Sequence, residues 1–420
     1  MNKRITLLLF FFPFVIAKAE NKVLSLSLRE AENYFVEHNL ELIAAKYNID
    51  LADAEICQAK LFDNPTISIE QNVYNRLNGR YFDFGKNGET ALEIEQPVYL
   101  AGQRNKRVRL AKINKKTAII EFEELLRNLR KELRVSFVEL YYSQQVAQIY
   151  NSQILSVTEI LEIYRNQEKK GNVALIERAR IEALLFSLQK EKQEIEQQTV
   201  SLQSKMRLLL GIRNEETIDP LFEEAQLRDI DISSVSFSRL ESLLEERPDI
   251  RGAKNCLKAS RADIRLQKSM AFPEVSIKAT YDKAGNIFKH YWAVGLNISV
   301  PIFNRNQGQI KAAKITAVQN IRKEELLKER AYNQLKESYA HLEKTMNLYR
   351  TSHYELLDDF DNIMKGVNEN FKKRNISLLE FVDFYESYKE TSLQLYQIRK
   401  ELILAFENIN SVVGNEIFSY

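Results

Sequence analysis

Two stretches of the chain, 65–98 and 273–301, alternate apolar and polar residues with a period of two. In the first, Ile67 and Ile69 flank Ser68, and in the second Val294 and Leu296 flank Gly295. Because successive side chains of a strand point to opposite faces, each stretch predicts a hairpin of two strands of about ten residues. Alternation alone favours a soluble hairpin with one buried face, although membrane-barrel strands have the same length and alternation.

The rest of the chain carries apolar residues at steps of three and four, which predicts helices. Helices are expected over roughly 28–62 and 239–270, 101–168 and 305–371, and 172–210 and 375–413. Helix breakers are scarce, with 12 Gly and 7 Pro in 420 residues. The predicted helix over 101–168 would be about 100 Å long at 1.5 Å per residue. It also carries a coiled-coil seam, formed by Ile119, Phe122, Leu126, Leu129, Leu133, Phe137 and Leu140.

The same order of segments occurs twice. Residues 169–177 read KKGNVALIE and residues 372–380 read KKRNISLLE, and Leu210-Gly211 matches Val413-Gly414 at the same offset. We therefore predict a tandem repeat, with a first copy at 20–211, a linker at 212–238, a second copy at 239–414 and a tail at 415–420.

The first residues have the pattern of an export signal. Lys3 and Arg4 precede an apolar run over 5–16, and Ala17-Lys18-Ala19 fits a cleavage site, so we expect residues 1–19 to be removed. No later segment is long and apolar enough to span a membrane as a helix. If the exported protein crosses a membrane, it must do so as a barrel.

Four strands are too few to close such a barrel, because membrane barrels begin at about eight strands. An open sheet in lipid leaves backbone groups without partners, so several copies must share one barrel. Two copies give eight strands, whose interior is filled by side chains, whereas three give twelve and leave a lumen. The sequence thus predicts an α+β membrane protein, a trimer with a shared twelve-stranded barrel and long coiled-coil helices.

Composition and motifs argue against other classes. The chain has 60 Lys+Arg against 58 Asp+Glu, which does not suit a nucleic-acid binder. The four histidines are not in metal-ligand spacing and no phosphate loop or nucleophile motif is found, so we expect no enzyme, cofactor or metal site. Cys57 and Cys256 could form a disulfide after export. We favour the interpretation that both are small, buried apolar residues.

Three motifs resemble those of the TolC-type outer-membrane efflux proteins, over nearly the whole mature chain. They are LLEERPDIR at 243–251, QPVYLAGQ at 96–103 and VPIFNRNQG at 300–308, the last similar to the heavy-metal (CusC/CzcC-like) branch. The resemblance implies a homotrimeric exit duct in the outer membrane, with a helical tunnel in the periplasm. It implies as partners outer-membrane lipid, a periplasmic adaptor and an inner-membrane pump, most simply of the RND type. Heavy-metal cations are the substrate it suggests, with drugs and proteins left open.

The resemblance also places a pore gate in the chain. Glu380 and Asp383 match the acidic pair at the family's periplasmic constriction, and they share one helix face at i,i+3. In the first repeat Glu177 matches Glu380, but Arg180 stands opposite Asp383. A carboxylate ring from three chains would favour cations. A solvated acidic face near a helix N-terminus explains the pair equally well, and Arg180 either bridges to an acid or lies on the surface.

The turns between the long helices are the expected adaptor-docking tips. They comprise Gly171, Asn172 and Val173 in the first repeat and Arg374, Asn375 and Ile376 in the second. Gly171 has the simpler interpretation of a residue that ends a helix. The rival function is a periplasmic coiled-coil adaptor or structural rod without a barrel, which would not need the four alternating strands.

Overall fold

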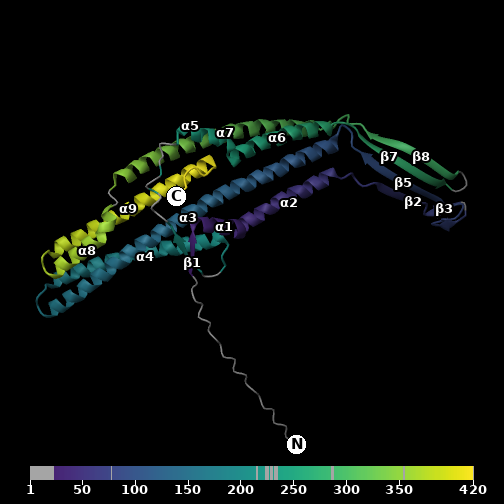
Figure 1. Cartoon of the computed structure of the whole chain (residues 1–420). Coiled ribbons are helices and arrows are strands. Elements are labelled where there is room, and N and C mark those ends of the chain that lie inside the picture. Colours follow the sequence, from purple (N-terminus) through teal and green to yellow (C-terminus); the bar gives the residue numbers. More distant parts are fainter. Residues whose placement is uncertain are drawn as a thin grey trace, which may run out of the picture. The chain divides into compact units, whose positions relative to one another are not determined.

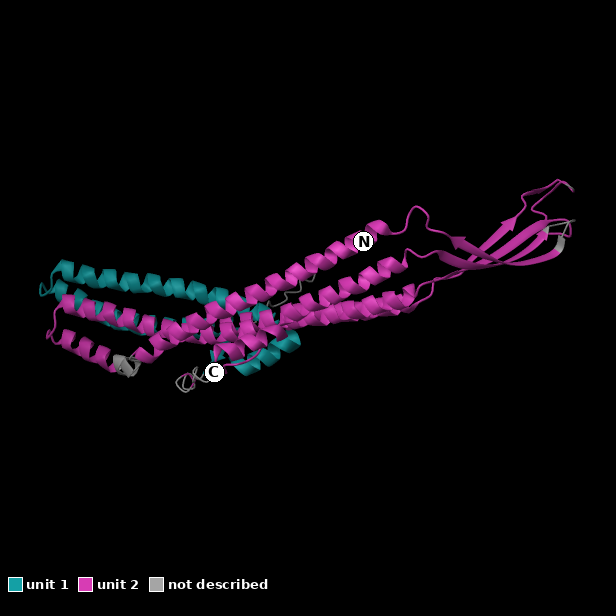
Figure 2. Ribbon diagram, turned by 90° about the horizontal axis from the view of Figure 1, so that it is seen from above, with its two compact units in different colours: residues 1–38, 136–222 teal, residues 39–135, 223–420 magenta. Residues whose placement is uncertain are grey.

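A computed structural model of the chain describes residues 23–76, 78–213, 216–222, 227, 230, 235–284, 288–352 and 355–419. The predicted signal over 1–19, part of the linker, residues 285–287 of a predicted turn and His353 lie outside these residues. The chain forms two compact units, residues 1–38 with 136–222 and residues 39–135 with 223–420 (Figure 2). None of the helices in the described part of the chain has both the length and the hydropathy to cross a membrane.

The larger unit contains a four-stranded antiparallel sheet of β2 (Thr66–Gln71), β5 (Glu89–Val98), β7 (Glu274–Ala284) and β8 (Phe288–Ser299). The two sequence stretches that alternate are joined by pairing of β5 with β7, in which Ile94 lies opposite Ala279. The sheet has the order β2-β5-β7-β8, so β2 and β8 are its edges. A small hairpin of β3 (Tyr74–Asn75) and β4 (Arg80–Tyr81) lies in the loop after β2 and was not predicted.

Helices α2 (Leu40–Lys60), α6 (Pro248–Ser269), α7 (Gln307–Thr351) and the first part of α3 (Gln103–Lys169) meet the sheet at its base (Figure 1). α7 packs along both α6 and α9 (Leu378–Val413), and α8 (Glu355–Lys372) packs on α9. The short α5 (Phe237–Leu243) and the 3-10 turn η3 (Leu244–Glu246) precede α6. Leu129 and Leu133 of the predicted seam are buried, as are Leu335, Leu342 and Met346 of α7.

The helix predicted over 305–371 is interrupted. α7 ends at Thr351, because Ser352 takes an extended conformation (φ −82°, ψ 137°) and its hydroxyl donates to the Leu348 carbonyl at 2.7 Å. A serine hydroxyl that competes for helix carbonyls favours such an end. The segment 28–62 likewise splits into α1 (Leu28–His38) and α2, because Asn39 leaves the helical region and caps α2 through the Leu42 amide at 2.9 Å.

The smaller unit joins α1, the second part of α3 and α4 (Leu175–Leu210) to a two-stranded parallel sheet of β1 (Val23–Ser27) and β6 (Thr217–Leu221). Gln203 of α4 holds β6 with two hydrogen bonds, donating to the Ile218 carbonyl at 2.6 Å and accepting from the Ile218 amide at 2.9 Å. The unit buries Phe35, Phe137, Ile181 and Met206 completely. Part of the predicted linker is therefore a strand packed in this unit.

Both cysteines are free thiols. Cys256 is half-buried but Cys57 is exposed, so the interpretation of two buried apolar residues was wrong for Cys57. It failed because Cys57 directly follows Ile56, which takes the buried face of α2. The next residue along a helix is turned about 100° away from that face.

The matched glycines end α4 and α9 in the left-handed conformation, with φ of 69° at Gly211 and 75° at Gly414. They differ in their surroundings. A Cβ on Gly211 would lie 2.3 Å from the His38 carbonyl oxygen, whereas a Cβ on Gly414 would meet nothing closer than 3.8 Å. At Gly211 both the backbone angle and the close approach of α1 therefore require glycine.

We predict that Gly414→Ala lowers the free energy of unfolding by about 1 to 2 kcal/mol, the cost of the left-handed conformation alone. Gly211→Ala must cost more, because the backbone of the smaller unit has to move. Thermal unfolding of the purified variants checks the order. Equal midpoints for the two variants would contradict the clash.

Candidate functional site

The two faces of the four-stranded sheet differ in polarity. One face is apolar and exposed, with Ile69 72%, Trp292 74% and Val294 83% accessible. The other face carries carboxylates, which are Glu70, Glu89, Glu93, Glu95, Glu274 and Asp282. On that face Lys278 forms ion pairs with Glu93 at 2.7 Å and Glu95 at 3.3 Å. A soluble hairpin would bury its apolar face, but no described part of the chain covers the apolar face of this sheet.

The turn between α8 and α9 holds the second group of predicted site residues. Arg374 has a positive φ of 59°, and the Asn375 amide donates back to the Asn370 carbonyl at 2.8 Å. The Asn375 side chain also donates to Asn370 Oδ1 at 3.0 Å. These bonds close the end of α8 in the manner of a Schellman motif, and they leave Arg374 and Asn375 exposed.

The turn between α3 and α4 has the same geometry in the smaller unit. Gly171 has φ of 73°, and the Asn172 amide and side chain bond to the carbonyl and side chain of Gln167, each at 2.9 Å. Gly171 therefore does end a helix, as its simpler interpretation proposed. Gly171 and Asn172 are exposed and Val173 is half-buried.

Glu380 has a definite structural task at the start of α9. Its carboxylate accepts from the Ser377 amide at 2.7 Å and the Ser377 hydroxyl at 2.8 Å, which forms a capping box. The hydrogen bond from the Ser377 backbone holds the pKa of Glu380 below its ordinary value. Asp383 lies one turn later and is exposed, and it has no hydrogen bond or ion pair with any residue that the structure describes.

The residues predicted to match them in the first half of the chain behave differently. Ala174 stands where the second repeat has Ser377, so α4 begins without a side-chain cap and Glu177 forms no capping box. Arg180 is exposed and bridges to no acid among the described residues. Arg178 does so instead, contacting Glu168 of α3 at 2.7 Å and Glu182 of α4 at 2.6 Å. Sequence reasoning missed Arg178, although its i,i+4 spacing to Glu182 was a usable signal.

The ERPD motif, residues 246–249, contains a buried arginine with several hydrogen bonds. Arg247 is 5% exposed and binds both oxygens of Asp249, at 3.0 and 2.7 Å. It also donates to the Val412 carbonyl of α9 at 2.9 Å and to Gln334 of α7 at 3.2 Å. Burial opposes ionisation of Asp249, but the hydrogen bonds and charge of Arg247 outweigh it and hold the pKa of that carboxyl below its usual range. The motif thus fastens the start of α6 to α7 and α9.

No three His, Cys, Asp or Glu side chains gather as metal ligands within the described ranges. The described residues thus offer an apolar sheet face, an acidic sheet face and exposed turns.

The profile of the outer membrane efflux protein family matches residues 35–212 and 240–347. The chain belongs to this family. It is similar to the cobalt-zinc-cadmium resistance protein CzcC of Cupriavidus metallidurans, with 25% identity over 298 residues, 69% of this chain and 66% of CzcC. It is also similar to the cation efflux system protein CusC of Escherichia coli, with 25% identity over 301 residues, 66% of this chain and 64% of CusC. The chain thus spans less than two thirds of the length of these curated relatives.

Its fold matches that of the outer membrane channel CmeC of Campylobacter jejuni. The TM-score is 0.76 at 14% identity, over 93% of this chain and 87% of CmeC. The chain therefore has the fold of TolC-like outer-membrane channels.

We predict that the first turn of α9 loses protection from amide hydrogen exchange in acid. Because the folded pKa of Glu380 is lowered, its stabilisation is fully present above the ordinary value of 4.5 and is lost as the pH falls through the folded value. Glu380→Gln keeps an acceptor for the capping box, so its protection should not depend on pH over this range. Equal pH dependence in Glu380→Gln would contradict the assignment.

Proposed function

We propose that this protein is the outer-membrane exit duct of a tripartite efflux system and carries substrates passively from the periplasm to the exterior. The exposed apolar face of the four-stranded sheet carries this proposal. The proposal agrees with a family of channel proteins, and the protein itself performs no chemical step.

The apolar face has the character of a lipid-facing surface. Its side chains form one continuous stripe across the four strands, in which Ile69 lies opposite Leu92, Leu92 opposite Tyr281, and Tyr281 opposite Trp292. Soluble proteins rarely leave so large an apolar area uncovered. A periplasmic rod would bury or lack this surface, so the sheet argues against the rival function.

The two open edges of the sheet support a shared barrel. Among the described strands, β2 pairs only with β5 and β8 only with β7. In lipid the free N–H and C=O groups of both edges need partners, and β2 of one copy can pair with β8 of the next. Such a head-to-tail contact closes into a ring. Three copies then supply twelve strands, which are arranged as six similar hairpins around the ring.

The helices next to these edges carry matching apolar stripes. Leu40, Ile43, Tyr47 and Leu51 of α2 are 38–63% exposed at helical spacing, and α2 leads directly into β2. Ile315, Val318 and Ile321 of α7 are 38–60% exposed, and α7 directly follows β8. The stripes can therefore pack against each other where the edges pair, which extends the ring into a helical tunnel in the periplasm.

The acidic face of the sheet would then line the lumen. Six carboxylates face one described base, Lys278, so the lumen favours cations. This charge, and the names of the relatives CzcC and CusC, support heavy-metal cations as the substrate.

The turn between α3 and α4 and the turn between α8 and α9 form the proposed gate and docking tips. Asp383 is free to join a ring of carboxylates from three chains, whereas Glu380 is held by Ser377 and adds its charge from a fixed position. Glu177 and Arg180 belong to the first repeat's side of the gate. The exposed turns 171–173 and 374–376 are the proposed contacts of a periplasmic adaptor, which links the duct to an inner-membrane pump of the RND type.

A charge on the apolar face is the direct test of membrane insertion. We predict that Val294→Lys and Ile69→Lys remove the protein from the outer-membrane fraction, because a Lys near the bilayer midplane costs roughly 2–4 kcal/mol. The measurement is the amount of heat-modifiable trimer in outer-membrane extracts.

Asn297→Lys and Ser68→Lys are matched controls on the opposite face of the same strands, and they should leave insertion unchanged. Loss of insertion in all four variants, or in none, would refute the lipid-facing assignment. A monomeric, water-soluble wild type without detergent would refute the duct itself.

The gate is tested by single-channel conductance in planar bilayers. We expect Asp383→Asn to reduce the preference for cations over anions more than Glu380→Gln does, because only Asp383 is unengaged. If neither variant changes selectivity or closure, these residues do not form the gate.

A further inference from the structure

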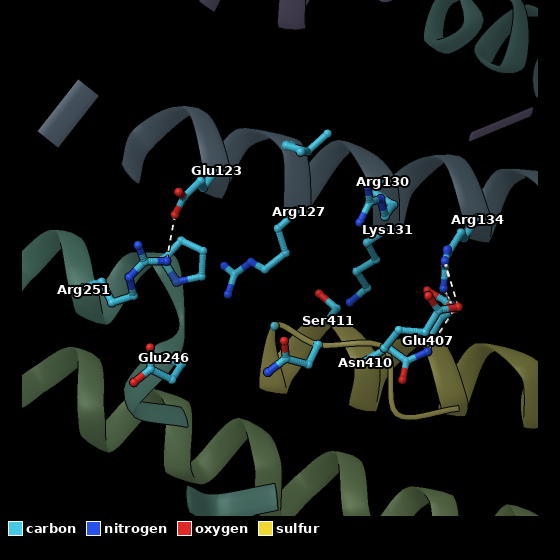
Figure 3. Close-up of a pocket in the computed structure, with 15 residues that line it drawn as sticks. Glu123, Arg127, Arg130, Lys131, Arg134, Glu246, Arg251, Glu407, Asn410 and Ser411 are labelled. Carbon is cyan, nitrogen blue, oxygen red and sulfur yellow. Dashed lines mark hydrogen bonds and ion pairs between the residues drawn. The ribbon is translucent and has the colours of Figure 1, made fainter. Parts of the chain in front are cut away.

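Arg127 and Lys131 lie one turn apart on the same side of α3 and point into the space between α3, the start of α6 and the end of α9 (Figure 3). The surrounding cavity has a volume of about 460 Å³. A second cavity of about 460 Å³ lies beside α7. Three residues line both cavities, and these are Arg127, Lys131 and Ser411.

The guanidinium of Arg127 is only partly partnered, since Nη2 donates a long hydrogen bond to Asn128 Oδ1 at 3.4 Å. Its side chain is 15% exposed, and Nε and Nη1 have no hydrogen-bond acceptor among the described residues. Its nearest carboxylate oxygen, on Asp249, is 3.8 Å from Nη1, which is too long for a hydrogen bond. Asp249 is already bound at both oxygens by Arg247. A buried guanidinium with unused donors is costly, because its desolvation is not compensated.

Lys131 is also without a hydrogen bond to the described residues. Burial lowers the pKa of its ammonium despite the attraction of Glu407, and Arg127 lowers it further. Two half-buried cations one turn apart repel each other, so a site of this kind favours a negative charge between them.

Three of the acids that line the first cavity are bound by arginines other than Arg127. Arg134 binds Glu407 at 2.9 Å and Glu416 at 3.2 Å. Arg251 binds Glu123 at 2.7 Å. Glu124 is near Arg127, and burial raises the pKa of its carboxyl. Glu246 is exposed at the rim, opposite the equally exposed Arg130.

We propose that Arg127, Lys131 and the Ser411 hydroxyl form a binding site for an oxyanion of the phosphate class. A guanidinium fork, an ammonium and a hydroxyl match the several acceptor oxygens of such a ligand. The bound anion ties α3 to the end of α9 and stabilises the larger unit. This site goes beyond the duct function and does not depend on it.

The test is a titration of the purified full-length protein in detergent with inorganic phosphate, against sodium chloride at equal ionic strength. We expect saturable binding by calorimetry and a rise in the thermal midpoint that chloride does not produce. Lys131→Met and Arg127→Gln should each weaken phosphate binding at least tenfold. In phosphate-free buffer Lys131→Met should unfold at the wild-type temperature or above, because the repulsion with Arg127 is removed, and this result shows that the variant is folded.

Lys373→Met, at an exposed lysine of the α8–α9 turn, is the matched control and should bind phosphate as the wild type does. Glycerol 3-phosphate distinguishes the source of the anion, since equal affinity indicates a site for phosphate esters and weaker affinity a site for the free ion. Both support the proposal. The proposal is overturned if phosphate affects the wild type no more than sodium chloride does. It is also overturned if Lys131→Met and Arg127→Gln bind phosphate with unchanged affinity.

Discussion

Unsatisfied backbone groups at the two edges of the sheet are the constraint on which the proposed architecture depends. A single chain provides four strands whose order, β2-β5-β7-β8, leaves both outer strands with one partner. Open edges are tolerated in water, but exposure of the apolar face to water is unfavourable. In lipid the apolar face is stable, but the open edges are not. In the proposed barrel, lipid covers the apolar face and a neighbouring copy provides hydrogen-bond partners at each edge. The apolar stripes on α2 and α7 extend the same lateral contact away from the membrane.

The two halves of the chain, which the sequence predicts to be a repeat, differ where they turn. The turn after α3 uses Gly171 for its left-handed residue, whereas the turn after α8 places Arg374 there and accepts strain of about 1 to 2 kcal/mol. The start of α9 has the Ser377–Glu380 capping box, which Ala174 cannot provide for α4. The acidic residues proposed for the gate thus lie on the helix with the better-fixed first turn, and this favours a defined position for Asp383.

Local pattern predicted much of this fold. Alternation located the strands, and steps of three and four located the helices, because both periods follow from backbone geometry. The breaks at Asn39 and Ser352 were missed, since a single side chain that competes with helix hydrogen bonds leaves the apolar period intact. At the site, Ser377 and Glu380 have a recognisable capping-box spacing. The partners of Arg247 and the isolation of Arg127 depend on residues far away in the sequence, which no local pattern reveals.

Buried charge separates two roles in the larger unit. Arg247 is fully bonded and fastens three helices, as a buried cation must to offset its desolvation. Arg127 of α3 instead keeps two guanidinium nitrogens, Nε and Nη1, without a hydrogen-bond acceptor among the described residues, although burial lowers its pKa. A structure that needed only rigidity would place an apolar side chain at such a position, as it does at Leu129 and Leu133 on the same helix. Retention of a cation with unused donors is therefore better explained by a ligand than by packing.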